Sequence, residues 1–119
     1  MNPRLTAFGG WKPLFWAAAL GILLLSLLPS ATPLPTTGWD KTNHLLGFGV
    51  LAALARFAYP GPAWPRLLGL LAYGALIEIL QSLTPDRSAE WADLFADSLG
   101  IAIGWCAAWV ATIGLQRRA

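Results

Sequence analysis

Charged side chains are scarce in this chain. They make up 12% of its 119 residues, whereas hydrophobic residues make up 56%. A soluble domain normally carries about 25% charged residues, so this composition excludes an ordinary soluble domain and indicates an integral membrane protein. A chain of this length is expected to form a single domain, which we assign to residues 1–119.

Cysteine is nearly absent as well. The only one, Cys106, lies in an apolar run, which excludes a disulfide within the chain and a CxxC metal site. The net charge of +2 is small, and the lysine and arginine residues are scattered along the chain. These two features argue against a nucleic-acid partner.

Four hydrophobic segments are separated by short breaks. The segments cover residues 13–28, 43–59, 66–83 and 92–115. Each approaches the roughly 20 residues that a helix needs to cross a bilayer. Proline lies in every break between them, and a helix does not continue through such a sequence. We therefore predict an all-α fold, an integral membrane bundle of four transmembrane helices.

The basic residues predict the orientation of these helices. They lie before the first segment, around the second break and after the fourth segment: Arg4, Lys12, Arg56, Arg66, Arg117 and Arg118. Lysine and arginine favour the cytoplasmic side of a membrane. We therefore expect a multi-pass protein of the cell membrane with both termini in the cytoplasm. The other two breaks then face outward.

The acidic residues all lie near the predicted outward ends of the helices. A charged group inside a bilayer costs several kcal/mol unless it is paired or faces water. Several polar residues are three or four positions apart, so each pair shares a helix face: Asp40 with His44, Glu78 with Gln81, and Asp93 with Asp97. We predict that they converge in one outward-opening polar pocket with two nearby cations. Its predicted members are Asp40, Lys41, His44, Glu78, Gln81, Arg87, Asp93 and Asp97.

A stripe of small residues runs along the fourth segment. Its members recur every four residues: Ala92, Ala96, Gly100, Gly104 and Ala108. Such a stripe lets a neighbouring helix approach closely. Gly47 and Gly74 are the candidates for the matching positions on the neighbours.

These motifs, in this order, resemble the VanZ-like family, which is named for a teicoplanin-resistance accessory protein. The matching residues are Asp40-Lys41-Thr42-Asn43-His44, Glu78-Ile79-Leu80-Gln81, Pro85-Asp86-Arg87, and Asp93-Leu94-Phe95-Ala96-Asp97 followed by Gly100. The resemblance covers about residues 39 to 108 and implies a small polytopic bacterial membrane protein. Many members have Asn at the position of Asp97, so this chain carries an additional carboxyl group there.

Three functions of the cluster stay open at this point: a structural ion-pair network, a binding site or an enzyme site. A binding site would take a membrane lipid or an amphiphilic cell-envelope molecule, and the resemblance adds a link to glycopeptide susceptibility. An enzyme would use His44 as a base oriented by Asp40, with Glu78 and Asp97 as a carboxylate pair. The residues favour binding slightly, because so many ionisable groups exceed what four short helices need to stay together.

We expect no bound metal and no cofactor. The residue types suit a metal, but the sequence contains neither His-x-x-x-His nor Glu-x-x-His. Lys41 and Arg87 also stand near the carboxylates as counter-charges. A transporter is a further reading, and four helices would have to form a homo-oligomer to alternate access. The oligomeric state therefore stays open.

Overall fold

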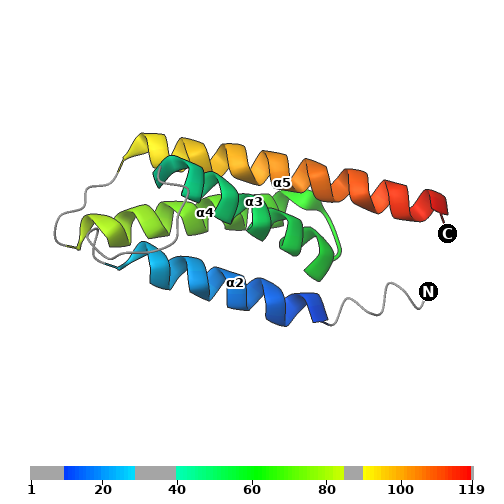
Figure 1. The fold of residues 1–119 in the computed structure, drawn as a ribbon, viewed down its shortest axis with the longest axis horizontal. Helices are drawn as coiled ribbons and strands as arrows, with labels where there is room; N and C mark the ends of the chain where they lie inside the picture. Colours follow the sequence, from blue (N-terminus) through cyan, green and yellow to red (C-terminus); the bar gives the residue numbers. More distant parts are fainter. Residues whose placement is uncertain (1–9, 29–39, 85–89, 119) are drawn as a thin grey trace.

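The computed structural model describes residues 10–28, 40–84 and 90–118. Within these residues the chain forms four α-helices and no strand (Figure 1). They are α2 (Trp11–Ser26), α3 (Asp40–Ala58), α4 (Ala63–Ser82) and α5 (Trp91–Arg118). The predicted all-α fold is confirmed, and the helix ends lie within about three residues of the predicted segment ends.

Successive helices run in opposite directions along the bundle. α2 begins and α5 ends at the end of the bundle that holds the turn between α3 and α4 (Figure 1). We call this the turn end. α3 and α5 begin, and α4 ends, at the opposite end, which we call the far end (Figure 1). The up-and-down arrangement therefore brings the predicted polar residues of three helices to the far end.

The turn between α3 and α4 is shorter than the sequence predicts. Pro65 lies inside the first turn of α4 and not in the break. The first N–H groups of a helix have no partner within it, so proline is tolerated there. Arg66 donates hydrogen bonds to the carbonyl oxygens of Tyr59, Gly61 and Pro62. Gly61 has φ +111°, a conformation that glycine adopts without strain.

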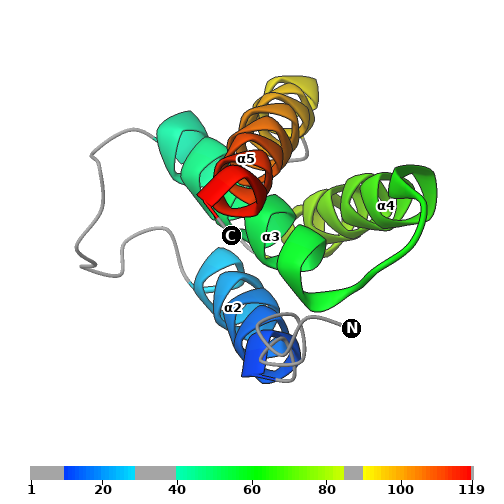
Figure 2. The ribbon, with the colours of Figure 1, turned by 90° about the vertical axis from the view of Figure 1, so that its right-hand side faces the viewer.

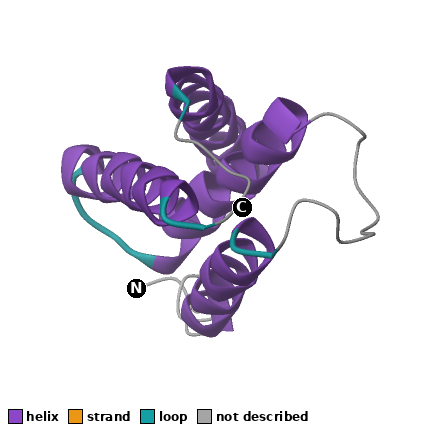
Figure 3. Cartoon of the chain, turned by 90° about the vertical axis from the view of Figure 1, so that its left-hand side faces the viewer, coloured by secondary structure: helices purple, strands orange, loops and turns teal. Residues whose placement is uncertain are grey.

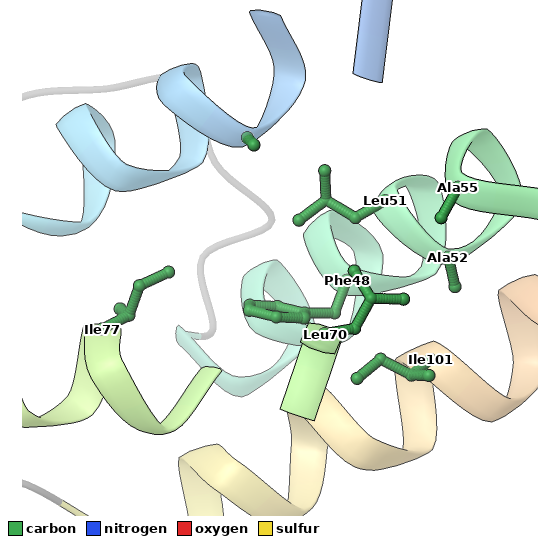
Figure 4. Packing of buried hydrophobic residues seen from close by; sticks show 8 residues of the cluster. Phe48, Leu51, Ala52, Ala55, Leu70, Ile77 and Ile101 are labelled. Atoms are coloured by element: carbon green, nitrogen blue, oxygen red, sulfur yellow. The ribbon is translucent and has the colours of Figure 1, made fainter. Parts of the chain in front are cut away.

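α3 lies at the centre of the bundle (Figure 2). It contacts each of the other three described helices and packs most extensively on α5. Seen from the far end, α2 lies apart from α5, whereas α4 contacts α5 as well as α3 (Figure 3). The buried core reflects this arrangement, because α3 supplies four of its eight residues (Figure 4). Its members are Ala19, Phe48, Leu51, Ala52, Ala55, Leu70, Ile77 and Ile101.

α3 and α5 are in contact backbone to backbone. A Cβ added at Gly100 would lie less than 3.0 Å from the carbonyl oxygen of Leu45, and one at Gly104 equally close to that of Gly49. Real Cβ atoms essentially never show such separations. The two glycines are therefore required by the close approach of the helices, as the small-residue stripe predicts.

Two details of the predicted stripe differ from the structure. Ala92 is exposed, whereas the four later members are buried. The glycine of α3 that meets α5 is Gly49, while Gly47 faces Ile22 of α2. A shift of two residues turns the helix by about 200°, so Gly47 and Gly49 lie on opposite faces of α3.

The outer surface of the bundle is strongly apolar. Trp16 is 60% exposed and Ile103 is 53% exposed, whereas the side chain of Asp97 is fully buried. Proteins in water show the reverse distribution, with charged groups outside. Large exposed apolar surfaces mark contact with lipid or with another protein. The distribution fits a membrane protein.

Two of the described helices are long and apolar enough to cross a membrane. They are Ala63–Ser82, which is α4, and Trp91–Gly114 within α5. α2 has 16 residues, about 24 Å, which is less than the roughly 30 Å of a hydrocarbon core. α3 carries three charged residues, Asp40, Lys41 and Arg56. The structure thus supports a membrane protein, and crossing by all four helices remains a proposal.

Candidate functional site

Polar side chains from three helices meet at the far end of the bundle. We call this group the polar cluster. Its described members come from α3, from α4, and from α5 with the residue before it: Lys41, His44, Glu78, Glu90, Asp93 and Asp97. Four of them are buried, and Lys41 and Glu90 form the partly exposed rim. Predicted members of all three helices therefore do come together.

His44 and Asp97 form the centre of the cluster. Nδ1 of His44 lies 2.8 Å from Oδ1 of Asp97. His44 is one turn before Phe48, so it extends the core face of α3 to the far end. Gly74 of α4 makes room for the carboxylate, because a Cβ there would lie 2.8 Å from Oδ2 of Asp97. The burial of Asp97 thus depends on a glycine of the neighbouring helix.

Lys41 joins the starts of α3 and α5. Its Nζ lies 2.9 Å from Oε2 of Glu90 and 3.1 Å from Oδ1 of Asp93. The hydrogen bond from Lys41 holds the pKa of Glu90 below its ordinary value. Because the Glu90 side chain is half exposed, this pair adds little to stability. It fixes the position of the rim.

Glu78 lies between the rim and the centre. Its Oε2 accepts a hydrogen bond from the backbone N–H of Glu90 at 3.1 Å. Its Oε1 is buried and has no hydrogen-bond partner. Leaving a buried acceptor unsatisfied costs about 1–3 kcal/mol, and more when the group is charged. At this oxygen the geometry calls for a further partner.

Three members of the cluster are placed to hold a metal ion. His44, Glu78 and Asp97 each offer one ligand atom, and these atoms lie within 4.8 Å of one another. The three residues come from α3, α4 and α5. Because they lie on different helices, the spacing of residues in the sequence does not reveal that they form a group. The expectation that no metal binds rests on that spacing and on the counter-charges of Lys41 and Arg87, and the structure does not test it.

Gln81 does not contact the described cluster. Its Nε2 donates a hydrogen bond to the carbonyl oxygen of Ser26 at 2.9 Å. Residues three apart on a helix differ in direction by about 60°, and this offset turns Gln81 from Glu78 toward α2. The side chain of Asp40 and all of Arg87 lie outside the described residues.

Glu90 is the member that the predicted site left out. It precedes the first residue of α5, where sequence patterns place the boundary of a helix least reliably. The sequence did offer one indication. Glu90 lies three residues before Asp93, and residues at that spacing share one face of a helix. Its backbone N–H contacts Glu78 while its side chain contacts Lys41.

A cavity of about 260 Å³ lies apart from the polar cluster. It lies between α2, α3 and α4, extends to the turn end and is partly open to the surface. Aromatic and aliphatic side chains line most of it, including Phe15, Trp16, Tyr59, Leu70 and Tyr73, with Arg66 among them. No member of the polar cluster lines this cavity. The predicted outward-opening pocket at the cluster therefore stays a prediction.

Comparison with known proteins gives one match. A family model described as VanZ/LLP1 matches residues 11–112. The search of curated proteins and the search of solved structures each found no match. The matched range includes the described parts of α2, α3 and α4, all members of the polar cluster and most of α5.

Proposed function

This chain belongs to the VanZ/LLP1 family, and from that premise we propose that its polar cluster binds the head group of an amphiphilic cell-envelope molecule. The protein would act in the membrane as a four-helix bundle and alter susceptibility to glycopeptides. The observation that carries the proposal is the buried Oε1 of Glu78, which has no hydrogen-bond partner. Buried polar groups of folded proteins are nearly always paired, so this one supports a missing ligand.

The charges of the cluster narrow the class of ligand. Among the described residues, four carboxyl groups accompany one lysine and one histidine: Glu78, Glu90, Asp93 and Asp97 with Lys41 and His44. A ligand that complements this excess brings positive charge, as an amine of the head group or as a cation bound with it. Ile79, Leu83 and Phe95 are exposed near the same end. They offer an apolar surface for the acyl chain.

Glu78→Gln separates ligand binding from a purely structural network. The substitution keeps the shape of the side chain and removes its charge. We expect the glycopeptide phenotype, and the lipid that copurifies with the protein, to be lost at normal protein level. Susceptibility to teicoplanin in a bacterial host and mass spectrometry of the purified sample measure the two effects. Ser82→Ala is the matched control, because Ser82 is exposed on the same helix and its Oγ donates a hydrogen bond to the carbonyl oxygen of Ile79 one turn earlier.

A structural network would give the opposite result. Glu78→Gln would then lower the free energy of unfolding by about 1–3 kcal/mol. The phenotype would fall only in proportion to the amount of protein. That pair of results would contradict the proposal.

We also propose that both termini lie in the cytoplasm. Lys12, Arg56 and Arg66 lie toward the turn end, whereas the described acidic residues lie toward the far end (Figure 1). In a Cys106→Ala background, Trp91→Cys should react with an impermeant thiol reagent added to intact cells, because Trp91 is 86% exposed. Pro62→Cys should not react. Labelling of Pro62→Cys alone would reverse the orientation.

A further inference from the structure

We propose that His44, Glu78 and Asp97 bind a divalent transition-metal ion. The inference rests on the proposed function in one respect, because the metal would supply the positive charge that the cluster calls for. One ligand atom from each residue lies within 4.8 Å of the other two. The residues stand on three different helices, so the metal would also join α3, α4 and α5 at the far end.

The ligand types select the class of metal. One imidazole nitrogen and two carboxylate oxygens suit Zn²⁺, Mn²⁺ and Fe²⁺. Mg²⁺ and Ca²⁺ prefer ligand sets made only of oxygen. Bonds of about 2.0–2.2 Å to a common ion place the ligand atoms roughly 3–4 Å apart. The three ligand atoms, within 4.8 Å of one another, lie near that spacing.

Glu78 supplies an observation that points to a ligand independently of the clustering. The residue is 6% exposed, and its buried Oε1 has no hydrogen-bond partner. Its other oxygen is held by the backbone N–H of Glu90, which fixes the carboxylate in place. A metal ion bound at Oε1 would give this oxygen its partner.

The surroundings of the three ligands fit a metal site as well. Lys41 contacts Glu90 and Asp93, so its charge is directed to the rim. Oδ2 of Asp93 lies 4.0 Å from Nε2 of His44. This separation is too long for a hydrogen bond, but a small movement of Asp93 would let it orient the imidazole when Nδ1 binds the metal, as outer carboxylates do for histidine ligands. Three protein ligands leave coordination positions open, where oxygen atoms of a head group can bind.

The test measures metal on the purified protein without any amphiphile. The protein in detergent is stripped with EDTA, reloaded with Zn²⁺ or Mn²⁺, desalted and analysed for metal content. We expect about one ion per chain and a higher melting temperature, because the ion binds the folded state. Mg²⁺ at the same concentration should produce neither effect.

Two glutamate variants form a matched pair. Glu78→Gln should weaken Zn²⁺ binding by about tenfold or more. Removing a residue that only hydrogen-bonds a metal ligand already costs about tenfold, and Glu78 would be a ligand itself. Glu90→Gln removes a carboxylate at the same end that is not one of the three ligands, and it should keep the stoichiometric ion. If Glu78→Gln does not fold, Asp97→Asn takes its place.

Two results would overturn the inference. The first is a folded wild-type protein that holds no stoichiometric Zn²⁺ or Mn²⁺ after reloading. The second is an equal loss of binding in Glu78→Gln and Glu90→Gln, which would show general attraction to acidic groups. Neither result contradicts the proposed function, because a protein without metal that still copurifies with its lipid would still bind an amphiphile.

Discussion

Replacing Gly104 with alanine is expected to lower the free energy of unfolding by about 3 kcal/mol, the upper part of the usual range for overpacking. The added Cβ would lie less than 3.0 Å from the carbonyl oxygen of Gly49. A backbone atom does not move aside as a flexible side chain does, so α3 and α5 must separate. Chemical unfolding in detergent, followed by circular dichroism, measures the effect.

Gly114→Ala is the control for this experiment. Gly114 lies on the same helix, and a Cβ there would meet no atom within 4 Å. Alanine favours a helix over glycine by about 1 kcal/mol, so this variant should be unchanged or slightly more stable. Equal losses in the two variants would show that the close approach of the helices does not set the stability of the bundle.

The second large effect is expected at the centre of the polar cluster. Asp97→Ala should lower the free energy of unfolding by about 3–5 kcal/mol, because it leaves one member of a buried pair without the other. Asp97→Asn keeps an oxygen that can accept a hydrogen bond from His44, so it should cost about 1–2 kcal/mol. Both values are measured after treatment with EDTA, so that metal binding does not contribute.

A double-mutant cycle tests whether the two residues act as a pair. His44 and Asp97 are in contact, with Nδ1 and Oδ1 2.8 Å apart. Removing both with alanine should therefore cost much less than the sum of the two single losses. Additive losses would mean that the contact contributes no coupling energy.

The positions of the helices were predictable because membrane helices have strong local signals. The length of each apolar segment and the prolines between the segments locate α2 to α5 within a few residues. The place of α3 in the bundle was harder to predict from the sequence. α3 combines helical length with Lys41 and Arg56, and its place at the centre of the bundle becomes visible only when the other helices surround it.

The candidate site was predictable in its membership more than in its geometry. Shared depth on three helices placed His44, Glu78, Asp93 and Asp97 together, and the structure brings them together. The sequence could not predict that the side chain of Gln81 points toward Ser26, because this orientation depends on where α2 packs. The candidate metal-ligand group was not predictable for a similar reason. Spacing in the sequence relates residues within one helix, whereas His44, Glu78 and Asp97 come from three different helices.

The order of the helices along the chain also affects how the protein is made. Lys41, His44 and Gly49 of α3 contact residues on α5 or just before it, which are synthesised after α3 and α4. The ribosome adds about 60 residues between the end of α3 and the end of α5, which takes roughly 3–12 s at typical rates. During that interval α3 lacks its carboxylate and glycine contacts on α5. The packing of α3 is therefore completed only when α5 arrives beside it.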